Sequence, residues 1–419
     1  MFVQHLNISI ALIVFMGLAS GGMLALMLMT TRKYQLSFSI VLLLVVALAV
    51  AGVLTSVSFI ENFSQGLANA VVLLVLSFAL GYALTTFSVL SYSTKRKGPA
   101  TRAGRPDLTA VIQLTQGEPP DYGVESASRR LALADDPQDV PPVLFRPFYL
   151  RDLRSKYARI GSSPYREYHN ELARKVQSRL DNTHKVYSAF YSDKPSFASA
   201  LSDAIESGAR KVVVVHVRIT DPPDPVKAGE LFEGLNPASY GVQLQELGPM
   251  WDSDLLPQIY VRRVLEAAPQ LDSDPANIGL LLIGRGHEVP HGKARQSSST
   301  RYRQEADFQA RLRRALLKVG FDESRVVACW LRAHGPTSTE ALQSLAAAGA
   351  RSVLWMPSTF PADGINTLWD IPAQLDPVAA KLGLKLSSLG AWNADDLTAE
   401  DIAARLRQVP AAIPSPALS

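Results

Sequence analysis

The residues best suited to chemistry follow a short apolar run in the second half of the chain. Residues 280–291 read LLLIGRGHEVPH, so an apolar segment of strand length ends in Gly-Arg-Gly, and His287 follows at once. In an α/β protein the chain leaves a strand at such a point and enters the crevice where ligands bind. An imidazole there can act as a base or as a metal ligand near neutral pH. His287 is therefore the leading candidate both for catalysis and for metal binding.

The same residues contain a pattern that zinc proteases use. HEVPH at 287–291 matches H-E-x-x-H, in which both histidines must lie on one face of a helix. Here the pattern follows Gly286, and Pro290 lies between the two histidines. A proline inside a helix costs about 3 kcal/mol. A membrane zinc metalloprotease therefore remains only as an alternative from another class of protein.

The elements that must position His287 alternate between strands and helices after residue 107. LTAVIQL begins at Leu108, KVVVVHV covers 211–217, and helix-like segments that end at glycines lie between such runs. Nearly continuous apolar strands of this kind are typical of parallel sheets covered by helices. We predict an α/β fold of two doubly wound, Rossmann-like halves whose parallel sheets face a cleft. Residues 221–257 are rich in Pro and Gly and are predicted to be loop, with one short helix at most.

The beginning of the chain is almost free of charge. Before Lys95 the only Lys, Arg, Asp or Glu residues are Arg32, Lys33 and Glu61. Three apolar segments result, at about 7–30, 36–60 and 67–90, and each exceeds the roughly 20 residues that cross a bilayer. Basic residues gather between the first two segments and after the third, so the positive-inside rule places the N-terminus outside and everything after the third segment in the cytoplasm. We expect a multi-pass protein of the inner (plasma) membrane.

These boundaries predict the domains. They are a three-helix transmembrane anchor (1–92), a basic linker (93–107), an N-terminal α/β half (108–260), a C-terminal α/β half (261–410) and a disordered tail (411–419). Apart from the basic residues beside the apolar segments the chain is near neutral, so it has no electrostatic footprint for nucleic acid. The one cysteine, Cys329, lies in the strand-like run VVACWL and is predicted to be a small buried hydrophobe, which excludes a disulfide framework within the chain.

The soluble part of the sequence resembles the ferrochelatase family. LLIGRGHEVP resembles the segment in which a strand of that family ends in Ser-Ala-His-x-Leu-Pro, with His287 on the histidine and Pro290 on the proline. LTAVIQLTQGEPPDYG is similar to the family's first strand and its Gly-x-Pro loop, and KYARIGSSPYREYHNELARKVQSRL to its Tyr-x-x-Ile-Gly-Gly-x-Ser-Pro segment and the helix after it. VLWMPSTFPADGINTLWDI resembles Val-x-Val-Pro-x-x-Phe-x-x-Asp-His-x-Glu-Thr-Leu-x-Glu. These segments follow one another in the family's order.

The resemblance implies that a divalent metal, preferably Fe²⁺, is inserted into a porphyrin in haem biosynthesis. Two pyrrole protons must leave as the metal enters, and an imidazole and carboxylates can accept them. The positions implied for catalysis are His287, Asp370, Asn366, Asp363 and Glu288. Those expected to contact the porphyrin are Tyr157, Ile160, Ser163, Pro164 and, as a partner for propionates, Arg285. His287 and His216 are expected to contact the metal, with Fe²⁺ as a substrate and no tightly bound cofactor.

At two positions of the last motif the ionisable residue of the family pattern is missing. The family's second histidine falls on Gly364 and its catalytic glutamate on Asn366, whose amide cannot relay a proton. A catalytically impaired membrane protein that binds a tetrapyrrole or haem is therefore an open alternative. The expected partners in both cases are a porphyrin or related tetrapyrrole, a divalent metal and the membrane, without nucleic acid. A membrane protein that accepts haem is one further candidate partner.

Overall fold

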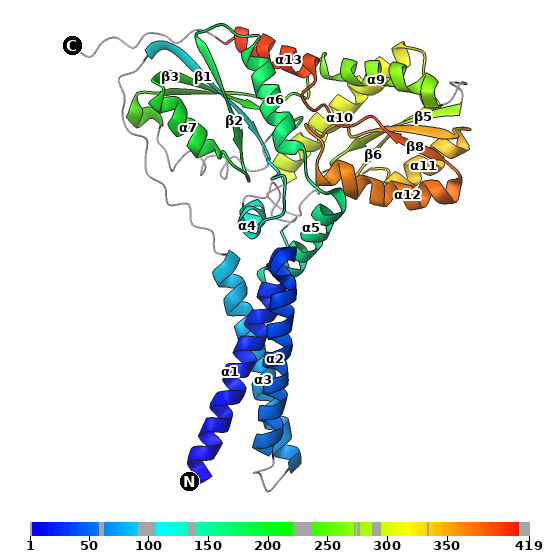
Figure 1. Ribbon diagram of the computed structural model, residues 1–419. Coiled ribbons are helices and arrows are strands. Elements are labelled where there is room, and N and C mark those ends of the chain that lie inside the picture. The colour runs from blue at the N-terminus through cyan, green and yellow to red at the C-terminus, as the bar shows by residue number, and fades with distance from the viewer. Residues whose placement is uncertain are drawn as a thin grey trace, which may run out of the picture. The chain divides into compact units, whose positions relative to one another are not determined.

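The structure is a computed structural model that describes residues 2–57, 63–90, 105–132, 140–221, 237–271, 274, 277–286, 295–332 and 335–409 (Figure 1). The chain divides into two compact units. One consists of Met1–Lys95 with Asp121–Arg159, and the other of Arg96–Pro120 with Ile160–Ser419. The first unit holds the long apolar helices, and the second holds both sheets.

Three long helices form from the uncharged segments, namely α1 (Phe2–Met29), α2 (Arg32–Val57) and α3 (Phe63–Leu90). Each contains a stretch that is long and apolar enough to cross a membrane, as the sequence predicts. Gly81 of α3 lets α1 come close, because a Cβ at this position would lie 2.1 Å from the carbonyl oxygen of Leu18. Small residues allow such packing where the surrounding lipid is as apolar as the helices themselves.

Two further helices, α4 (Val124–Ala132) and α5 (Arg146–Ile160), follow a polar turn and the 3-10 turn η2 (Val143–Phe145), respectively. The last carbonyl groups of a helix have no partner within it. At the end of α1, the guanidinium of Arg154 donates to the carbonyl oxygen of Thr30 at 2.6 Å, and the hydroxyl of Tyr122 donates to that of Met29 at 2.6 Å. Polar side chains of the first unit thus satisfy the C-terminal end of α1.

The first sheet is parallel and has the strand order β2-β1-β3-β4. Its strands are β1 (Arg105–Thr115), β2 (His184–Phe190), β3 (Ala209–His216) and β4 (Gln243–Leu247). Successive residues of a strand point to opposite faces. Ile112 and Leu114 accordingly join a cluster with α7 (Phe197–Glu206), whereas Val111 joins the cluster that contains Leu172 of α6 (Tyr165–Gln177). Both faces are therefore apolar, which explains the continuous valine run of β3.

β4 corrects one sequence prediction. It lies within 221–257, where the sequence predicts loop, and it is preceded by the 3-10 turn η3 (Pro237–Tyr240). QLQEL has only two apolar residues, and it becomes a strand through parallel pairing with β3, in which Val213 lies opposite Gln245.

The second sheet repeats the arrangement of the first, with the order β6-β5-β7-β8 and all pairs parallel. Its strands are β5 (Ile278–Gly284), β6 (Val326–Trp330), β7 (Ser352–Met356) and β8 (Lys385–Ser388). The accompanying helices are α9 (Leu256–Leu271), α10 (Arg295–Lys318), η5 (Glu323–Arg325), α11 (Ser338–Ala347), η6 (Asn366–Asp370), α12 (Ile371–Leu382) and α13 (Asp396–Arg407). Figure 1 shows helices around each sheet. The prediction of two parallel, doubly wound α/β halves is confirmed.

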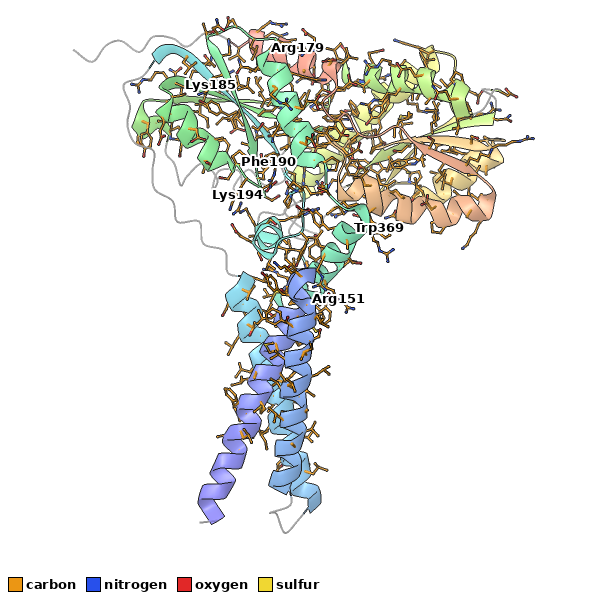
Figure 2. All side chains as sticks on the ribbon, viewed as in Figure 1. Arg151, Arg179, Lys185, Phe190, Lys194 and Trp369 are labelled. Atoms are coloured by element: carbon orange, nitrogen blue, oxygen red, sulfur yellow. The ribbon has the colours of Figure 1, made fainter. Side chains whose placement is uncertain are left out.

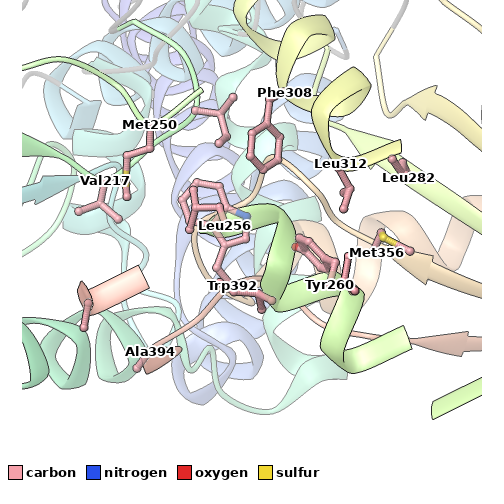
Figure 3. Packing of buried hydrophobic residues seen from close by; sticks show 14 of the residues in the cluster. Val217, Met250, Leu256, Tyr260, Leu282, Phe308, Leu312, Met356, Trp392 and Ala394 are labelled. Carbon is pink, nitrogen blue, oxygen red and sulfur yellow. The ribbon is translucent and has the colours of Figure 1, made fainter. Parts of the chain in front are cut away.

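One apolar cluster joins the two halves of the second unit (Figure 3). It combines Val111 of the first sheet with Leu282 of the second, and Tyr260 of α9 and Trp392 are completely buried within it. Their polar atoms are paired, because the Tyr260 hydroxyl donates to the carbonyl oxygen of Pro357 and the Trp392 indole N–H to that of Ser358, both at 2.9 Å. The core thereby fixes the loop that follows β7.

Candidate active site at the carboxyl ends of the sheets

A buried carboxylate connects the carboxyl ends of the two sheets. Glu118 lies in the Gly-x-Pro loop after β1, and only 5% of its surface is exposed. It accepts a hydrogen bond from the Ser163 hydroxyl and another, of 2.8 Å, from the backbone N–H of Ile365. Ile365 follows β7 in the second half, so this bond spans the two halves. Ligands of open α/β sheets bind at such carboxyl ends, which makes this junction the candidate site.

Four of the residues expected to contact a porphyrin lie in and before the loop that leads into α6. Ser163 is buried and donates to Glu118. Pro164 precedes the first residue of α6, and Ile160 is partly exposed at the end of α5. Tyr157 belongs to the first unit, where its buried ring lies edge-on to Tyr122. Their contact with a substrate stays a prediction.

The segment after β7 carries three of the predicted catalytic positions. The carboxylate of Asp363 accepts hydrogen bonds from the backbone N–H of Ala391 at 3.1 Å and from the side-chain amide of Asn393 at 2.7 Å, so it holds the loop after β8. Asn366 and Asp370 are the first and last residues of η6, which is a π turn, and both are partly exposed. Figure 2 marks Trp369 on the same turn. π turns within helices are rare and are frequent at functional sites.

The Gly-Arg-Gly segment lies on a second buried carboxylate, that of Glu305 on α10. This carboxylate accepts hydrogen bonds from the backbone N–H of Arg285 at 2.7 Å, from that of Gly286 at 3.2 Å and from the Thr359 hydroxyl at 2.7 Å. Burial raises the pKa of Glu305, although these hydrogen bonds act in the opposite direction. A Cβ at Gly284 would lie 2.9 Å from the same carboxylate, so a side chain at the end of β5 would have to displace it.

His287 and Glu288 lie outside the described residues. The chain that carries them starts from Gly286, whose backbone N–H is held by Glu305. The side chain of Arg285 is partly exposed beside them in the sequence. The roles of these three residues stay predictions.

His216, the other histidine expected at the metal, ends β3 and is 2% exposed. Its Nδ1 lies 3.1 Å from the Tyr191 hydroxyl, and its Nε2 lies 2.9 Å from a carboxylate oxygen of Glu246 on β4. The hydrogen bond from His216 lowers the pKa of Glu246. A metal at His216 would have to replace one of these two partners. Within the described part of the chain, no three His, Cys, Asp or Glu side chains are grouped so as to hold a metal ion.

His169 and Cys329 are buried titratable groups outside the candidate site. His169 of α6 lies within hydrogen-bonding distance of the carbonyl oxygen of Gln113, at 2.9 Å, and burial lowers its pKa to about 4, so the ring is neutral at pH 7. Cys329 on β6 is buried as predicted, and burial raises the pKa of its thiol to about 12. Neither group is a candidate for the site.

The structure thus brings some predicted residues together and adds others. Ser163 and the segment that starts at Asp363 meet through Glu118. The backbone N–H of Arg285 donates to the Thr359 hydroxyl oxygen at 2.9 Å, and both residues also bond Glu305. Neither glutamate is among the residues predicted from the sequence. Glu118 could have been noticed as a charged residue within the Gly-x-Pro loop. Glu305 could have been noticed because helical spacing puts it on the same face of α10 as Phe308 and Leu312, which are buried.

Comparison with known proteins agrees with this architecture. The sequence model of the Ferrochelatase family matches residues 141–409, more than half of the chain. The Ferrochelatase of Geotalea daltonii is 23% identical over 323 residues, which cover 72% of this chain and 98% of that protein. The Coproporphyrin III ferrochelatase of Mycolicibacterium paratuberculosis is 27% identical over 160 residues, or 36% of this chain and 45% of the relative.

Among solved structures, SirB from Bacillus subtilis with Fe3+ is similar over 72% of this chain and 95% of its own, with 12% identity and a TM-score of 0.46. A likeness at that level carries no argument about function. The match to the family model, which extends over more than half of the chain and into both α/β halves, does carry one, and it shows that the chain belongs to the ferrochelatase family.

Proposed function

We propose that the protein is a membrane-anchored, ferrochelatase-like enzyme that inserts a divalent metal, preferably Fe²⁺, into a porphyrin in haem biosynthesis. The observation that supports this most is the family match over 141–409, which includes the loop with Ser163 and the segment after β7. His287 lies at the histidine of the family's strand-end motif, next to the segment that Glu305 holds. The two relatives given above are both named as ferrochelatases.

The proposed roles follow the chemistry of the exchange. As the metal forms bonds to the four ring nitrogens, two pyrrole N–H bonds break, and two protons must be accepted and passed to water. His287 accepts one proton or contacts the incoming metal, and His216 contacts the metal from the end of β3. Glu288 and Asp370 attract the cation and carry protons, while Asp363 keeps the neighbouring loop in place.

The substrate contacts are proposed from the same loops. Tyr157, Ile160, Ser163 and Pro164 line the porphyrin, and Arg285 pairs with a propionate, for which a guanidinium is a good partner. The substrate metal is Fe²⁺, and no tightly bound cofactor is needed.

The three apolar helices support membrane attachment. We infer that they cross the plasma membrane with the N-terminus outside and the α/β halves in the cytoplasm, because the basic residues lie on that side. Such an anchor would keep the site near apolar porphyrin or near a membrane protein that accepts haem. Labelling of single cysteines introduced between α2 and α3 and after α3, in a Cys329→Ala background and in intact cells, tests the orientation.

A second function is favoured by one observation, the replacement of the family's glutamate by Asn366. In that case the protein binds a tetrapyrrole or haem without inserting metal. The zinc metalloprotease alternative finds no support in the family match, and a stoichiometric amount of tightly bound zinc would be needed to revive it.

Metal insertion by the full-length protein in lipid nanodiscs distinguishes the two functions. Fe²⁺, Co²⁺, Ni²⁺ and Zn²⁺ are each offered with protoporphyrin, coproporphyrin and a sirohydrochlorin-type ring, and the absorption spectrum of the metallated ring is followed. Metal insertion with Fe²⁺ and a porphyrin supports the proposal. Quenching of porphyrin fluorescence without a metalloporphyrin spectrum for any pair supports the binding protein instead.

A further inference from the structure

At Gly364 the neighbouring atoms, and not the backbone conformation, leave no room for a side chain. Its φ is not in the left-handed region, so other residues could adopt its conformation. A Cβ on Gly364 would, however, lie 2.7 Å from the carboxylate oxygen Oε1 of Glu118. Real Cβ atoms do not come so close to an oxygen, so any side chain at 364 would have to displace that carboxylate.

The carboxylate therefore occupies the space in which a side chain at 364 would begin. In the family pattern a histidine falls on this position, and here the loop after β1 supplies an ionisable group from the opposite half. The residue two positions on, Asn366, has an amide in place of the family's carboxyl group. Gly364 and Asn366 thus leave this segment without the histidine and the glutamate of the family pattern, and Glu118 places one acid–base group beside it.

The surroundings of Glu118 fit an oriented proton acceptor. Its Oε1 receives both the backbone N–H of Ile365 and the hydroxyl of Ser163, which fix the carboxylate between the halves. Ser163 is also one of the residues proposed to face the porphyrin. The group next to Ser163 is consequently within one side chain of the ring in the proposed complex.

We propose that Glu118 is the acid–base group that replaces, in space, the side chain absent at Gly364. The inference rests on the proposed metal insertion. When the metal enters, one pyrrole N–H proton passes to the Glu118 carboxylate and the other to His287, while the N–H electron pairs stay on the nitrogens and bind the metal. Glu118 and His287 then release both protons to water, which leaves the enzyme unchanged.

A purely structural role predicts a different result for one conservative variant. Glu118→Gln keeps the size of the side chain and an oxygen that can accept from Ile365 and Ser163, but it cannot take up a proton. If Glu118 only holds the halves together, this variant should remain active. If Glu118 accepts a proton, kcat should fall by about 10²-fold or more, with little change in KM or in the Kd for porphyrin.

The experiment measures metal insertion and porphyrin binding by the full-length protein in nanodiscs for wild type, Glu118→Gln, Glu118→Ala and the double variant Glu118→Ala/Gly364→His. Glu266→Gln, an exposed carboxyl change on α9, is the matched control. We expect Glu118→Gln and Glu118→Ala to bind porphyrin but to insert metal slowly. We expect the double variant to regain at least about tenfold over Glu118→Ala, because an imidazole then stands in the vacated space.

The outcomes separate this inference from the proposed function. An active wild type with an equally active Glu118→Gln overturns the inference and leaves the function standing. A wild type that inserts no metal with any ring overturns both. If Glu118→Gln no longer binds porphyrin, the test is the rate of metal insertion by Glu118→Ala/Gly364→His. A rate no higher than that of Glu118→Ala overturns the inference.

Discussion

The carboxylate of Glu305 is expected to hold the end of β5 in place, and its removal should loosen the chain just before His287. Glu305→Ala leaves the backbone N–H of Gly286 and the Thr359 hydroxyl without their acceptor in a buried place, while the N–H of Arg285 keeps only the Thr359 oxygen. Each such loss costs about 1–3 kcal/mol. Water that enters the space left by the carboxylate recovers part of this. We therefore expect a net local cost of about 3 kcal/mol.

Hydrogen exchange of the backbone amide of Gly286, which donates to the Glu305 carboxylate, is measured by mass spectrometry on the full-length protein in nanodiscs and tests this directly. A local cost of about 3 kcal/mol corresponds to exchange about 10²-fold faster, since about 1.4 kcal/mol is a factor of ten. Glu305→Gln is the matched control, because it keeps one acceptor oxygen and should accelerate exchange only about tenfold. Exchange in Glu305→Ala within about twofold of wild type would refute the reasoning.

Three further predictions concern pH and the first unit. Because burial raises the pKa of Glu305 above its ordinary 4.5, the stability contributed by its protonated form is fully present below that value and is lost as pH rises through the raised pKa of the folded state. Urea unfolding should therefore show a stability difference, wild type minus Glu305→Gln, that decreases with rising pH; an increase would contradict it. Arg154→Ala should lower stability in detergent by about 1–3 kcal/mol, because the carbonyl groups at the end of α1 lose their donor, and thermal melting against the exposed Arg151→Ala checks this. Gly81→Val should separate α1 from α3 and lower the melting temperature, whereas Leu80→Val on the exposed side of α3 should not; equal effects would count against the packing described.

Composition and strand patterning made much of the fold predictable. The valine run of β3 and the apolar run of β5 are buried on both faces, so each strand carries its own signal in the sequence. The long uncharged helices are equally plain, because helix length and apolarity are local properties. β4 could not be predicted in this way, since QLQEL has little apolar character and owes its conformation to pairing with β3.

The site was less predictable, because its contacts join residues that are distant in the sequence. The hydrogen bond from Ile365 to Glu118 joins residues 247 positions apart, and no pattern within either segment predicts it. The resemblance points to Gly364 and Asn366 as departures from the family pattern, but only the structure shows which carboxylate lies against Gly364. Glu305 shares a helix face with Phe308 and Leu312, but only the structure shows that its carboxylate bonds the end of β5.

The most direct test of the proposed function is the rate of Fe²⁺ insertion into a porphyrin by full-length wild type and His287→Ala in nanodiscs, under anaerobic conditions. His291→Ala, which changes the next imidazole along the chain, is the control. We predict that wild type and His291→Ala form the metalloporphyrin, and that His287→Ala binds the ring but inserts metal about 10²–10⁴-fold more slowly. An unchanged rate in His287→Ala, or no insertion by the wild type, would contradict the proposed function of this site.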